Sequence, residues 1–484
     1  MLKQNFTQPD NIKVMLNIGG LLDIPTGFFI KGSNGENVLL GGLGAITAIV
    51  GRGNKYKSTI LHYMMLSAAD RLSSTTETSM STYDTEINIH EHALKRFVNK
   101  FESFQNQDIL QDGTWVITDK TIYHGNTWFE KAKEYLASKK DNASKLMVET
   151  PFFGRDGTSK LKIVVPTFGE VDSFSEFETE DVSKMQNDNE LGESGGNTIH
   201  MRQGLAKTRF LMEAPVLFGS NNHFLLMTAH LDDSIQVASG PYVQAPVKKL
   251  QHMKMGDKIK GVTGKFFFLM NNCWHASNST PLVNALTKAP EYPRNSNDTM
   301  AGDTDLNEVN LVQLRGKSGP SGFSITMVVS QSEGVLPSLT EFHYLKNYKD
   351  HIYNRFGISG TLQNYSLDLL PDVKLSRTTV RSKIDTNPRL RRALNITAEL
   401  AQMHQYYRHL ADVLCSPKEL YDDLVKLGYD WDMILDKTRG WWAVESDKHP
   451  LLFLSTLDLL QMRQGTYFPF WMEEDKSIKA KYQK

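Results

Sequence analysis

The chain has 484 residues, of which 40% are hydrophobic and 23% are charged, and its formal net charge is -1. This length predicts two or three domains with a sizeable core. The balanced charge excludes a globally basic nucleic-acid-binding protein, so any basic surface has to be local. With 2 cysteines the chain has neither a disulfide scaffold nor a multi-thiolate zinc site, which is typical of a reducing compartment. No signal-peptide core or apolar run of about 18 residues occurs, so we expect a cytoplasmic protein without a membrane anchor.

The first stretch that points to a function lies between Gly41 and Met65, where an apolar run, a glycine-bearing turn and a helical pattern follow one another. Residues 45–50 are typical of a buried strand, and residues 62–69 have helical apolar spacing. The turn between them has the layout of a phosphate-binding loop. In such a loop backbone N–H groups surround the phosphates, a lysine meets the terminal phosphates and a hydroxyl holds magnesium.

We assign the lysine and hydroxyl roles to Lys57 and Ser58. Tyr56 departs from the usual pattern, which has glycine directly before the lysine, so a basic surface turn before an ordinary helix is the alternative. The residues expected to contact the nucleotide are Gly51, Arg52, Gly53, Asn54, Lys55, Tyr56, Lys57, Ser58 and Thr59.

Three later apolar strands are each expected to end in a polar residue. The strand that begins at Met80 ends near Glu86, a carboxylate that can polarise an attacking water. The next ends at Asp172, which can hold magnesium through water, and a third ends at His230. Solvated strand ends are the alternative. Polar tips on successive strands favour one edge of a parallel sheet, where such folds bind their ligands.

Other elements are predicted more briefly. We expect a hairpin over 152–165, an acidic mobile loop over 178–194, a helix over 200–217, a strand over 266–270 and a polar insertion over 278–307. A second hairpin over 310–329 carries Arg315 and Lys317 at its turn. Beyond residue 345 helical patterns dominate.

Two stretches are locally basic. Residues 248–265 hold six lysines and one acid, which predicts a flexible loop that meets phosphate or, alternatively, a solvated loop. Residues 374–392 hold seven cations against Asp385. They suit contacts with a nucleic-acid backbone, and a charged helical face without a ligand is the alternative.

These pieces, in this order, resemble the RecA-type recombinases, especially the phage branch. The resemblance covers residues 20–345, and it makes an aromatic residue at Tyr56 a family trait. It implies that Glu86 activates water, that Asp172 lies on the magnesium side, and that His230 senses the terminal phosphate. It also implies that Arg315 and Lys317 reach the nucleotide of a neighbouring subunit.

The same resemblance implies two DNA-binding loops. The string ELGESGG at 190–196 is similar to the first, and residues 234–264 correspond to the second. The DNA-binding residues that it implies are Arg202, Lys207, Lys248, Lys249, Lys254, Lys258 and Lys260.

The expected fold is therefore α/β: a RecA-like P-loop ATPase core with a mainly parallel sheet flanked by helices, plus a mostly helical C-terminal domain. We expect a lead-in over 1–20, the core over 21–345, and a DNA- or partner-binding domain over 346–484. The expected function is an ATP- and Mg²⁺-dependent recombinase that binds single-stranded DNA as a homo-oligomer, with catalytic residues Glu86, Lys57, His230, Arg315 and Lys317. A replicative ring helicase is the alternative, supported by RGKSGPSG at 315–322, and a non-hydrolysing ATP-bound loading protein is a third reading.

Overall fold

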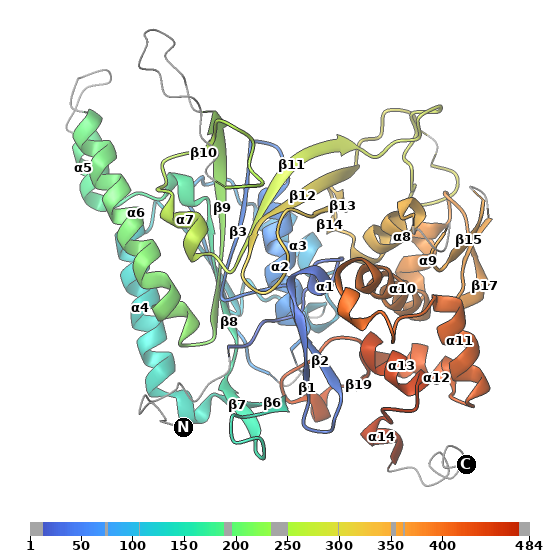
Figure 1. The fold of residues 1–484 in the computed structure, drawn as a ribbon. Coiled ribbons are helices and arrows are strands. Elements are labelled where there is room, and N and C mark those ends of the chain that lie inside the picture. The colour runs from blue at the N-terminus through green and yellow to red at the C-terminus, as the bar shows by residue number, and fades with distance from the viewer. Residues whose placement is uncertain are drawn as a thin grey trace.

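A large, mainly parallel sheet flanked by helices forms the centre of the molecule in the computed structural model (Figure 1). The model describes residues 13–72, 76–105, 107–187, 196–233, 250–298, 300–349, 355–361 and 364–473. The strands of the sheet, in spatial order, are β14 (Gly334–Val335), β13 (Ser324–Ser330), β12 (Leu306–Gly316), β11 (Asn272–Pro281), β3 (Ile46–Gly51), β9 (His223–Asp233), β8 (Thr167–Asp172), β4 (Met80–Asp84) and β5 (Trp115–Asp119), with β10 (Asp257–Ile259) paired to β9.

The strands from β11 to β5 run parallel to one another, whereas β12, β13 and β14 continue the sheet antiparallel. After β3 the chain crosses to β4, which lies beyond β9 and β8 in the sheet. Strands β5, β8 and β9 form on the same side of β3, and β11 then forms on its other side. The carboxyl ends of β3, β9, β8 and β4 therefore meet at one edge. In open α/β sheets this is the edge where ligands bind.

Two apolar layers cover the sheet because alternate residues of a strand point to opposite faces. In β9, Phe224 and Leu226 belong to one hydrophobic cluster, and Leu225 and Met227 belong to the other. The second cluster packs under α4 (Gly125–Asp141), α6 (Gly196–Gly219) and α7 (Lys265–Leu269). Helix α5 (Glu180–Asn187) lies beside α6 (Figure 1).

The first cluster joins the sheet to the C-terminal region. It packs under α2 (Lys57–Asp70), α3 (Glu91–Val98) and α8 (Pro337–Asn347), and its residues continue without a break into the C-terminal helices. These helices are α9 (Val380–Thr386), α10 (Pro388–Tyr406), α11 (Pro417–Lys426), α12 (Trp431–Lys437), α13 (Thr456–Arg463) and α14 (Phe470–Glu473). Figure 1 shows them on the side of the sheet away from α4 and α6.

The N-terminal residues hold this junction together. The hydroxyl of Tyr407, directly after α10, donates to the carbonyl of Ile24 at 2.9 Å, and Gln402 Nε2 donates to the carbonyl of Leu21 at 2.8 Å. Ile24 lies in α1 (Asp23–Thr26), and Leu21 lies two residues before this helix. The boundary predicted between residues 345 and 346 falls inside α8, so the C-terminal region and the sheet share one hydrophobic core.

Smaller elements complete the chain. The short strands form a hairpin of β1 (Phe28–Lys31) and β2 (Asn37–Leu40), a hairpin of β6 (Met147–Phe153) and β7 (Lys160–Val164), a sheet of β15 (Ile358–Thr361), β16 (Asn364–Leu367) and β17 (Leu370–Leu375), and the pair β18 (Thr438–Arg439) and β19 (Leu452–Phe453). Single 3₁₀ turns are η1 (Glu102–Phe104), η2 (Ala143–Lys145), η3 (Phe174–Glu176), η4 (Arg408–Leu410) and η5 (Ser446–Lys448).

Most predicted elements are confirmed, including the strand before the glycine-bearing turn, the following helix, both hairpins and the helix over 200–217. The strand predicted over 266–270 is wrong, because Phe266, Phe267 and Met270 are buried with helical spacing in and beside α7 while Phe268 is exposed. The predicted insertion begins too early, since β11 extends to Pro281. The acidic loop expected over 178–194 contains α5, and its residues 188–194 lie outside the described chain.

Candidate functional site

The loop between β3 and α2, residues 52–56, lies at the carboxyl edge of the sheet and leads directly into a helix N-terminus. Tyr56 is the residue before the helix and has a left-handed backbone with φ of 56°. Glycine adopts this conformation most readily, which explains why a phosphate loop usually carries glycine there. A Cβ on Gly53 would meet no atom within 4 Å, so this side of the loop is open.

Lys57 is the first residue of α2, and its ammonium folds back over the loop. Its Nζ donates to the carbonyl of Arg52 at 2.9 Å. Burial lowers the pKa of Lys57, and the nearby carboxylates of Asp172 and Glu86 oppose that shift. The lysine is therefore a buried cation that lies near two acids from neighbouring strands. Ser58 follows it on the same helical turn and is half-buried.

The carboxylate of Asp84 shapes the turn that presents Glu86. It accepts hydrogen bonds from the backbone N–H groups of Glu86, Ile87, Asn88 and Ile89, at 2.8 to 2.9 Å. Four donors on one side chain fix the turn after β4. This arrangement positions Glu86 above the sheet edge.

Glu86, which follows β4, contacts His230 near the carboxyl end of β9, two strands away in the sheet. Glu86 Oε1 and His230 Nε2 are 2.6 Å apart. The hydrogen bond from His230 is the main cause that lowers the pKa of Glu86 to about 2, and burial opposes it. In this arrangement Glu86 is an ionised but weakly basic carboxylate, so a change at His230 would change its basicity.

Asp172 ends β8 and lies between these groups in the sheet order. The hydroxyl of Thr228 donates to Asp172 Oδ1, and the backbone N–H of Thr85 donates to the carbonyl of Asp172 at 2.7 Å. Asp172 Oδ2 is buried and has no hydrogen-bond partner among the described residues. A buried free carboxylate oxygen near Lys57 suits a magnesium ion or a water bound to it.

An open cleft of about 660 Å³ lies over this edge of the sheet. Its lining residues are Thr85, Glu86, Lys120, Glu176, His230, Leu231, Asp232 and Lys260. The cleft therefore joins the Glu86–His230 pair to the segment after β10. Strand β10 itself contacts the β3–α2 loop, because Arg52 Nη2 lies 3.8 Å from the carboxylate of Asp257.

Arg315 and Lys317 lie toward the amino-terminal edge of the parallel strands, whereas the β3–α2 loop lies at their carboxyl edge. Arg315 pairs with Cys273, which is level with Ala48 of β3, and the N–H of Lys317 donates to the carbonyl of Asn271, which precedes β11. The guanidinium of Arg315 lies over the ring of Phe268 at 5.6 Å. Within one chain these cations do not meet the β3–α2 loop.

The predicted DNA-binding residues that the structure describes differ in exposure. Lys254 and Lys260 are exposed and Lys258 is half-buried, with Lys260 2.8 Å from Glu176. Arg202 is exposed on α6. Lys207 is buried instead: its Nζ donates to the carbonyl of Ser175 at 2.5 Å, and burial lowers its pKa to about 8.

Lys248 and Lys249 lie outside the described residues, as do the ELGESG residues 190–195 of the first predicted DNA loop. Most cations of the basic stretch at 374–392 contact groups of the same chain. Arg381 is buried and pairs with Glu333 at 3.2 Å and Asp305 at 3.5 Å. Arg392 is buried and donates to the carbonyl of Leu454. The sequence readings of this stretch as a free or DNA-facing surface therefore do not describe these two arginines.

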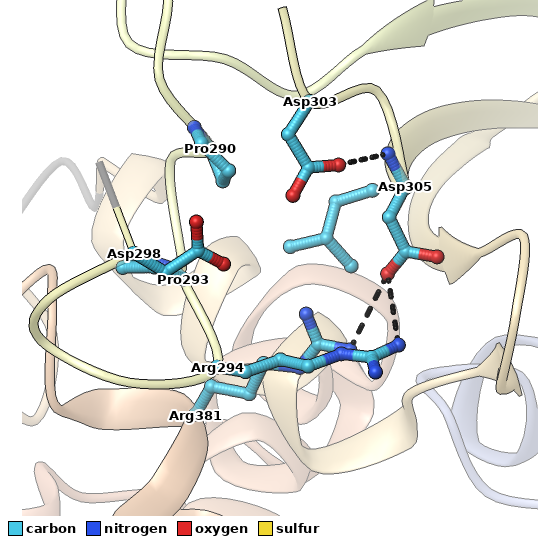
Figure 2. A pocket seen from close by; sticks show the side chains of 8 residues that line it. Pro290, Pro293, Arg294, Asp298, Asp303, Asp305 and Arg381 are labelled. Atoms are coloured by element: carbon cyan, nitrogen blue, oxygen red, sulfur yellow. Dashed lines mark hydrogen bonds and ion pairs between the residues drawn. The ribbon is translucent and has the colours of Figure 1, made fainter. Parts of the chain in front are cut away.

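A separate pocket of about 270 Å³ lies where the 282–305 loop meets α9 (Figure 2). Figure 2 shows Arg294 and Arg381 reaching the same carboxylate, that of Asp305. Asp303 faces the same hollow and accepts a hydrogen bond from the backbone N–H of Asp305 at 2.9 Å. The pocket is a charged joint between the sheet and the C-terminal region.

Several residues of the site were not predicted from the sequence. The carboxylate of Asp84 accepts hydrogen bonds from backbone N–H groups. Thr228 and Asp257 contact Asp172 and Arg52, which lie far away in the sequence. Asp84 had a local signal, because an aspartate followed by a short polar turn often accepts backbone N–H groups. Thr228 and Asp257 had none, since their roles depend on how β8, β9 and the β3–α2 loop meet.

No protein-family model and no curated protein matches this sequence. No helix in the described part of the chain is long and apolar enough to cross a membrane. Function is therefore inferred from the geometry of the carboxyl edge of the sheet.

Proposed function

We propose that this protein is a RecA-like P-loop ATPase that binds single-stranded DNA and acts as a recombinase. One observation supports the nucleotide site above all. The buried ammonium of Lys57, the Glu86–His230 pair and the free oxygen of Asp172 gather beyond the carboxyl ends of four adjacent strands, beside an open loop at a helix N-terminus. A nucleoside triphosphate needs this set: a cation and N–H groups for phosphate, an acid for magnesium and a base for water.

In this proposal the chain's own residues have distinct tasks. Lys57 and the N–H groups of residues 52–58 hold the terminal phosphates, and Ser58 and Asp172 hold magnesium. Bound Mg²⁺ would offset the phosphate charge. Glu86 accepts the proton of the attacking water at its carboxylate, and His230 controls that basicity through the 2.6 Å contact.

The coupling to DNA rests on two contacts. His230 lies on the strand that leads into residues 234–249, and Asp257 on the returning strand pairs with Arg52 of the β3–α2 loop. A nucleotide that moves either Glu86 or Arg52 therefore acts on the segment that carries Lys254 and Lys258. This is a physical route by which ATP could favour the DNA-binding arrangement.

A recombinase is favoured over a ring helicase by the environment of the β12–β13 turn. A Cβ on Gly319 would lie 2.3 Å from the carbonyl oxygen of Pro25, and one on Gly322 would lie 2.3 Å from the ring of His252. Gly319 and Gly322 thus approach the body of the chain, whereas a hairpin that moves along DNA in a ring has to project from it. The other residues of the turn, Lys317, Pro320 and Ser321, are exposed. Electron microscopy with an ATP analogue and single-stranded DNA separates the two, because helical filaments support the recombinase and closed rings support the helicase.

The nucleotide site itself is tested with Lys57→Ala. We expect the loss of ATP hydrolysis and at least a tenfold weaker ATP affinity, because the ammonium is the main charge that faces the phosphates. Lys140→Ala, an exposed lysine on α4, is the matched control and keeps both. ATP binding and turnover that survive in Lys57→Ala would contradict the site.

A mixing experiment tests the role of Arg315 and Lys317 across subunits. We expect an Arg315→Ala/Lys317→Ala double variant and Lys57→Ala to be inactive alone and to recover part of the ATPase activity when mixed, because some interfaces then pair an intact loop with intact cations. Inactive mixtures that still co-assemble would rule out action across the interface.

A further inference from the structure

Three buried side chains of the kind that bind metals converge between α2 and β8. Glu170 and Asp172 are two residues apart on β8, so both point toward the face of the sheet that α2 covers. His62 of α2 lies opposite them, with its Nδ1 2.9 Å from Glu170 Oε1. One ligand atom of each side chain lies within 4.8 Å of the other two, and His62, Glu170 and Asp172 are 4%, 0% and 3% exposed. An imidazole nitrogen and two carboxylates thus meet in the interior of the molecule.

Each carboxylate has one oxygen fixed by a threonine and one oxygen without a hydrogen bond. Thr82 Oγ1 donates to Glu170 Oε2 at 3.2 Å, and the hydroxyl of Thr228 donates to Asp172 Oδ1. His62 Nδ1 also bonds to Glu170 Oε2, at 3.0 Å, and a ring nitrogen carries a single hydrogen, so Oε1 stays unsatisfied although it faces the ring. Glu170 Oε1 and Asp172 Oδ2 are both buried and have no hydrogen-bond partner among the described residues. Buried oxygens normally bind a donor or a metal.

The surrounding groups hold Glu170 in place in the way that outer groups orient the ligands of a metal. Trp115 Nε1 donates to Thr82 Oγ1 at 2.9 Å, so the hydroxyl hydrogen of Thr82 is directed at Glu170. A path from solvent is close, because Thr85 lines the open cleft and its N–H donates to the carbonyl of Asp172. The three side chains are therefore oriented by their neighbours and lie beside an opening.

The charge of this cluster favours a divalent cation. Among the described residues no lysine or arginine forms an ion pair with Glu170 or Asp172, and His62 can offset only one of their two charges. The ammonium of Lys57 lies near Asp172 but donates to the carbonyl of Arg52. Two buried carboxylates are costly unless they are paired or coordinate a metal.

We infer that His62, Glu170 and Asp172 bind a divalent transition metal of the Zn²⁺ class. Imidazole together with carboxylates suits such a metal, whereas Mg²⁺ prefers oxygen ligands alone. The inference goes beyond the proposed function, because the magnesium assigned to Ser58 and Asp172 arrives with the nucleotide, whereas this metal binds without it. His62 lies one helical turn after Ser58, so the metal ties the start of α2 to β8.

The test uses the full chain without nucleotide, freed of metal by dialysis against a chelator and then titrated with Co²⁺ as a coloured substitute for Zn²⁺. We expect a single tightly bound Co²⁺ in the visible absorption, and at least about tenfold weaker binding in His62→Gln, because glutamine can still bond to Glu170 but lacks the imidazole ligand. His92→Gln, at an exposed histidine of α3, is the control and keeps the wild-type affinity. Equal Co²⁺ affinity in the wild type and His62→Gln would overturn the inference, as would displacement of Co²⁺ by an equal concentration of Mg²⁺.

A second measurement does not depend on how well His62→Gln folds. The ring of Trp115 lies 5.7 Å from the ring of His62, so Co²⁺ bound there should quench the fluorescence of this tryptophan. We expect quenching that follows the absorption step in the wild type and is lost in Trp115→Phe. Quenching that Trp115→Phe leaves unchanged would place the metal elsewhere and overturn the inference. Binding of a fluorescent ATP analogue with Mg²⁺ to the wild type is measured in parallel, and its absence contradicts the proposed function alone.

Discussion

Two stretches of this chain are similarly rich in cations, and the structure uses them differently. At the C-terminal stretch, Arg381 and Arg392 are buried and bound to carboxylates or carbonyls of the same chain. Beside the cleft, Lys254 is exposed and Lys258 half-buried, with no side-chain partner among the described residues. Charge in a sequence therefore indicates a ligand only where the fold leaves that charge without an internal partner.

The acidic groups show the same contrast. Asp305 and Glu333 receive arginines inside the molecule, whereas Asp172 keeps a buried oxygen with no described donor. A carboxylate with partners holds elements together. A buried carboxylate without one is positioned to receive something from outside the chain.

The largest expected effect concerns Glu86, which lines the open cleft. Glu86→Gln should leave ATP bound and slow its hydrolysis by roughly 10²- to 10⁴-fold, because the amide keeps the size of the side chain but cannot accept the proton. Single-turnover hydrolysis and equilibrium nucleotide binding separate the two effects. Weakened binding with an unchanged chemical step would remove Glu86 from the role of base.

Among the cations that pair inside the molecule, Arg381 should have the largest effect on stability. Arg381→Met should lower the free energy of unfolding by about 3 kcal/mol, because Asp305 and Glu333 then lose a buried cation partner. Urea denaturation measures this change. Lys418→Met breaks an exposed pair with Asp422 in the same region and should leave the free energy of unfolding nearly unchanged, because solvent screens exposed ion pairs. Similar small losses in both variants would mean that Arg381 is effectively a surface charge.

The junction between the sheet and the C-terminal helices contains a buried acid, Glu341, to which no described residue forms an ion pair. Burial is the main cause that raises the pKa of Glu341 to about 8, and the neighbouring Glu399 adds to it. The folded chain then keeps a proton that the unfolded chain has lost above about pH 4.5. Stability should therefore fall as the pH rises from about 5 to 8, by up to about 1.4 kcal/mol per pH unit.

Glu341→Gln should flatten this pH dependence, since the amide does not titrate. Chemical denaturation at pH 5, 6, 7 and 8 measures it, and Glu91→Gln, an exposed glutamate of α3, is the control that keeps the wild-type slope. A Glu341→Gln protein with an unchanged pH slope would show that Glu341 is ionised in the fold.

The smallest expected effect concerns DNA. Replacing Lys254, Lys258 and Lys260 with alanine should reduce the salt slope of single-stranded DNA binding by about two units, at about 0.7 per phosphate contact. Lys374→Ala/Lys383→Ala removes two cations of the C-terminal stretch as the matched control and should leave the slope unchanged. The reverse result would make the C-terminal region the DNA reader. Fluorescence anisotropy over a salt series gives both slopes with the full chain, which is needed because the two regions share one core.

The sequence predicted best what depends on neighbours along the chain. The strand, loop and helix around Lys57 are contiguous. Of the three predicted strand ends, Asp172 ends β8, Glu86 lies two residues after the end of β4, and His230 lies three residues before the end of β9. Short apolar runs were ambiguous, so the helix of Phe266 and Phe267 was predicted as a strand. The real strand there, β11, begins with Asn272, a polar residue that is buried because its Nδ2 donates to the carbonyl of Gly42.

Burial of individual cations could not be predicted. Lys207 was expected to face DNA on its helix, but the carbonyl that it binds belongs to Ser175, 32 residues earlier in the sequence. Arg381 meets acids that lie more than forty residues away in sequence. Such partners are set by the packing of distant elements, which no local pattern reports.

The most direct test of the account is the affinity for single-stranded DNA with an ATP analogue and with ADP, measured in the wild type and in His230→Ala. We expect the wild type to bind DNA more tightly with the ATP analogue. We expect His230→Ala to lose this difference while it still binds ATP, because the contact between His230 and Glu86 links the two sites. Equal DNA affinity with both nucleotides in the wild type, or a difference that His230→Ala leaves intact, would contradict it.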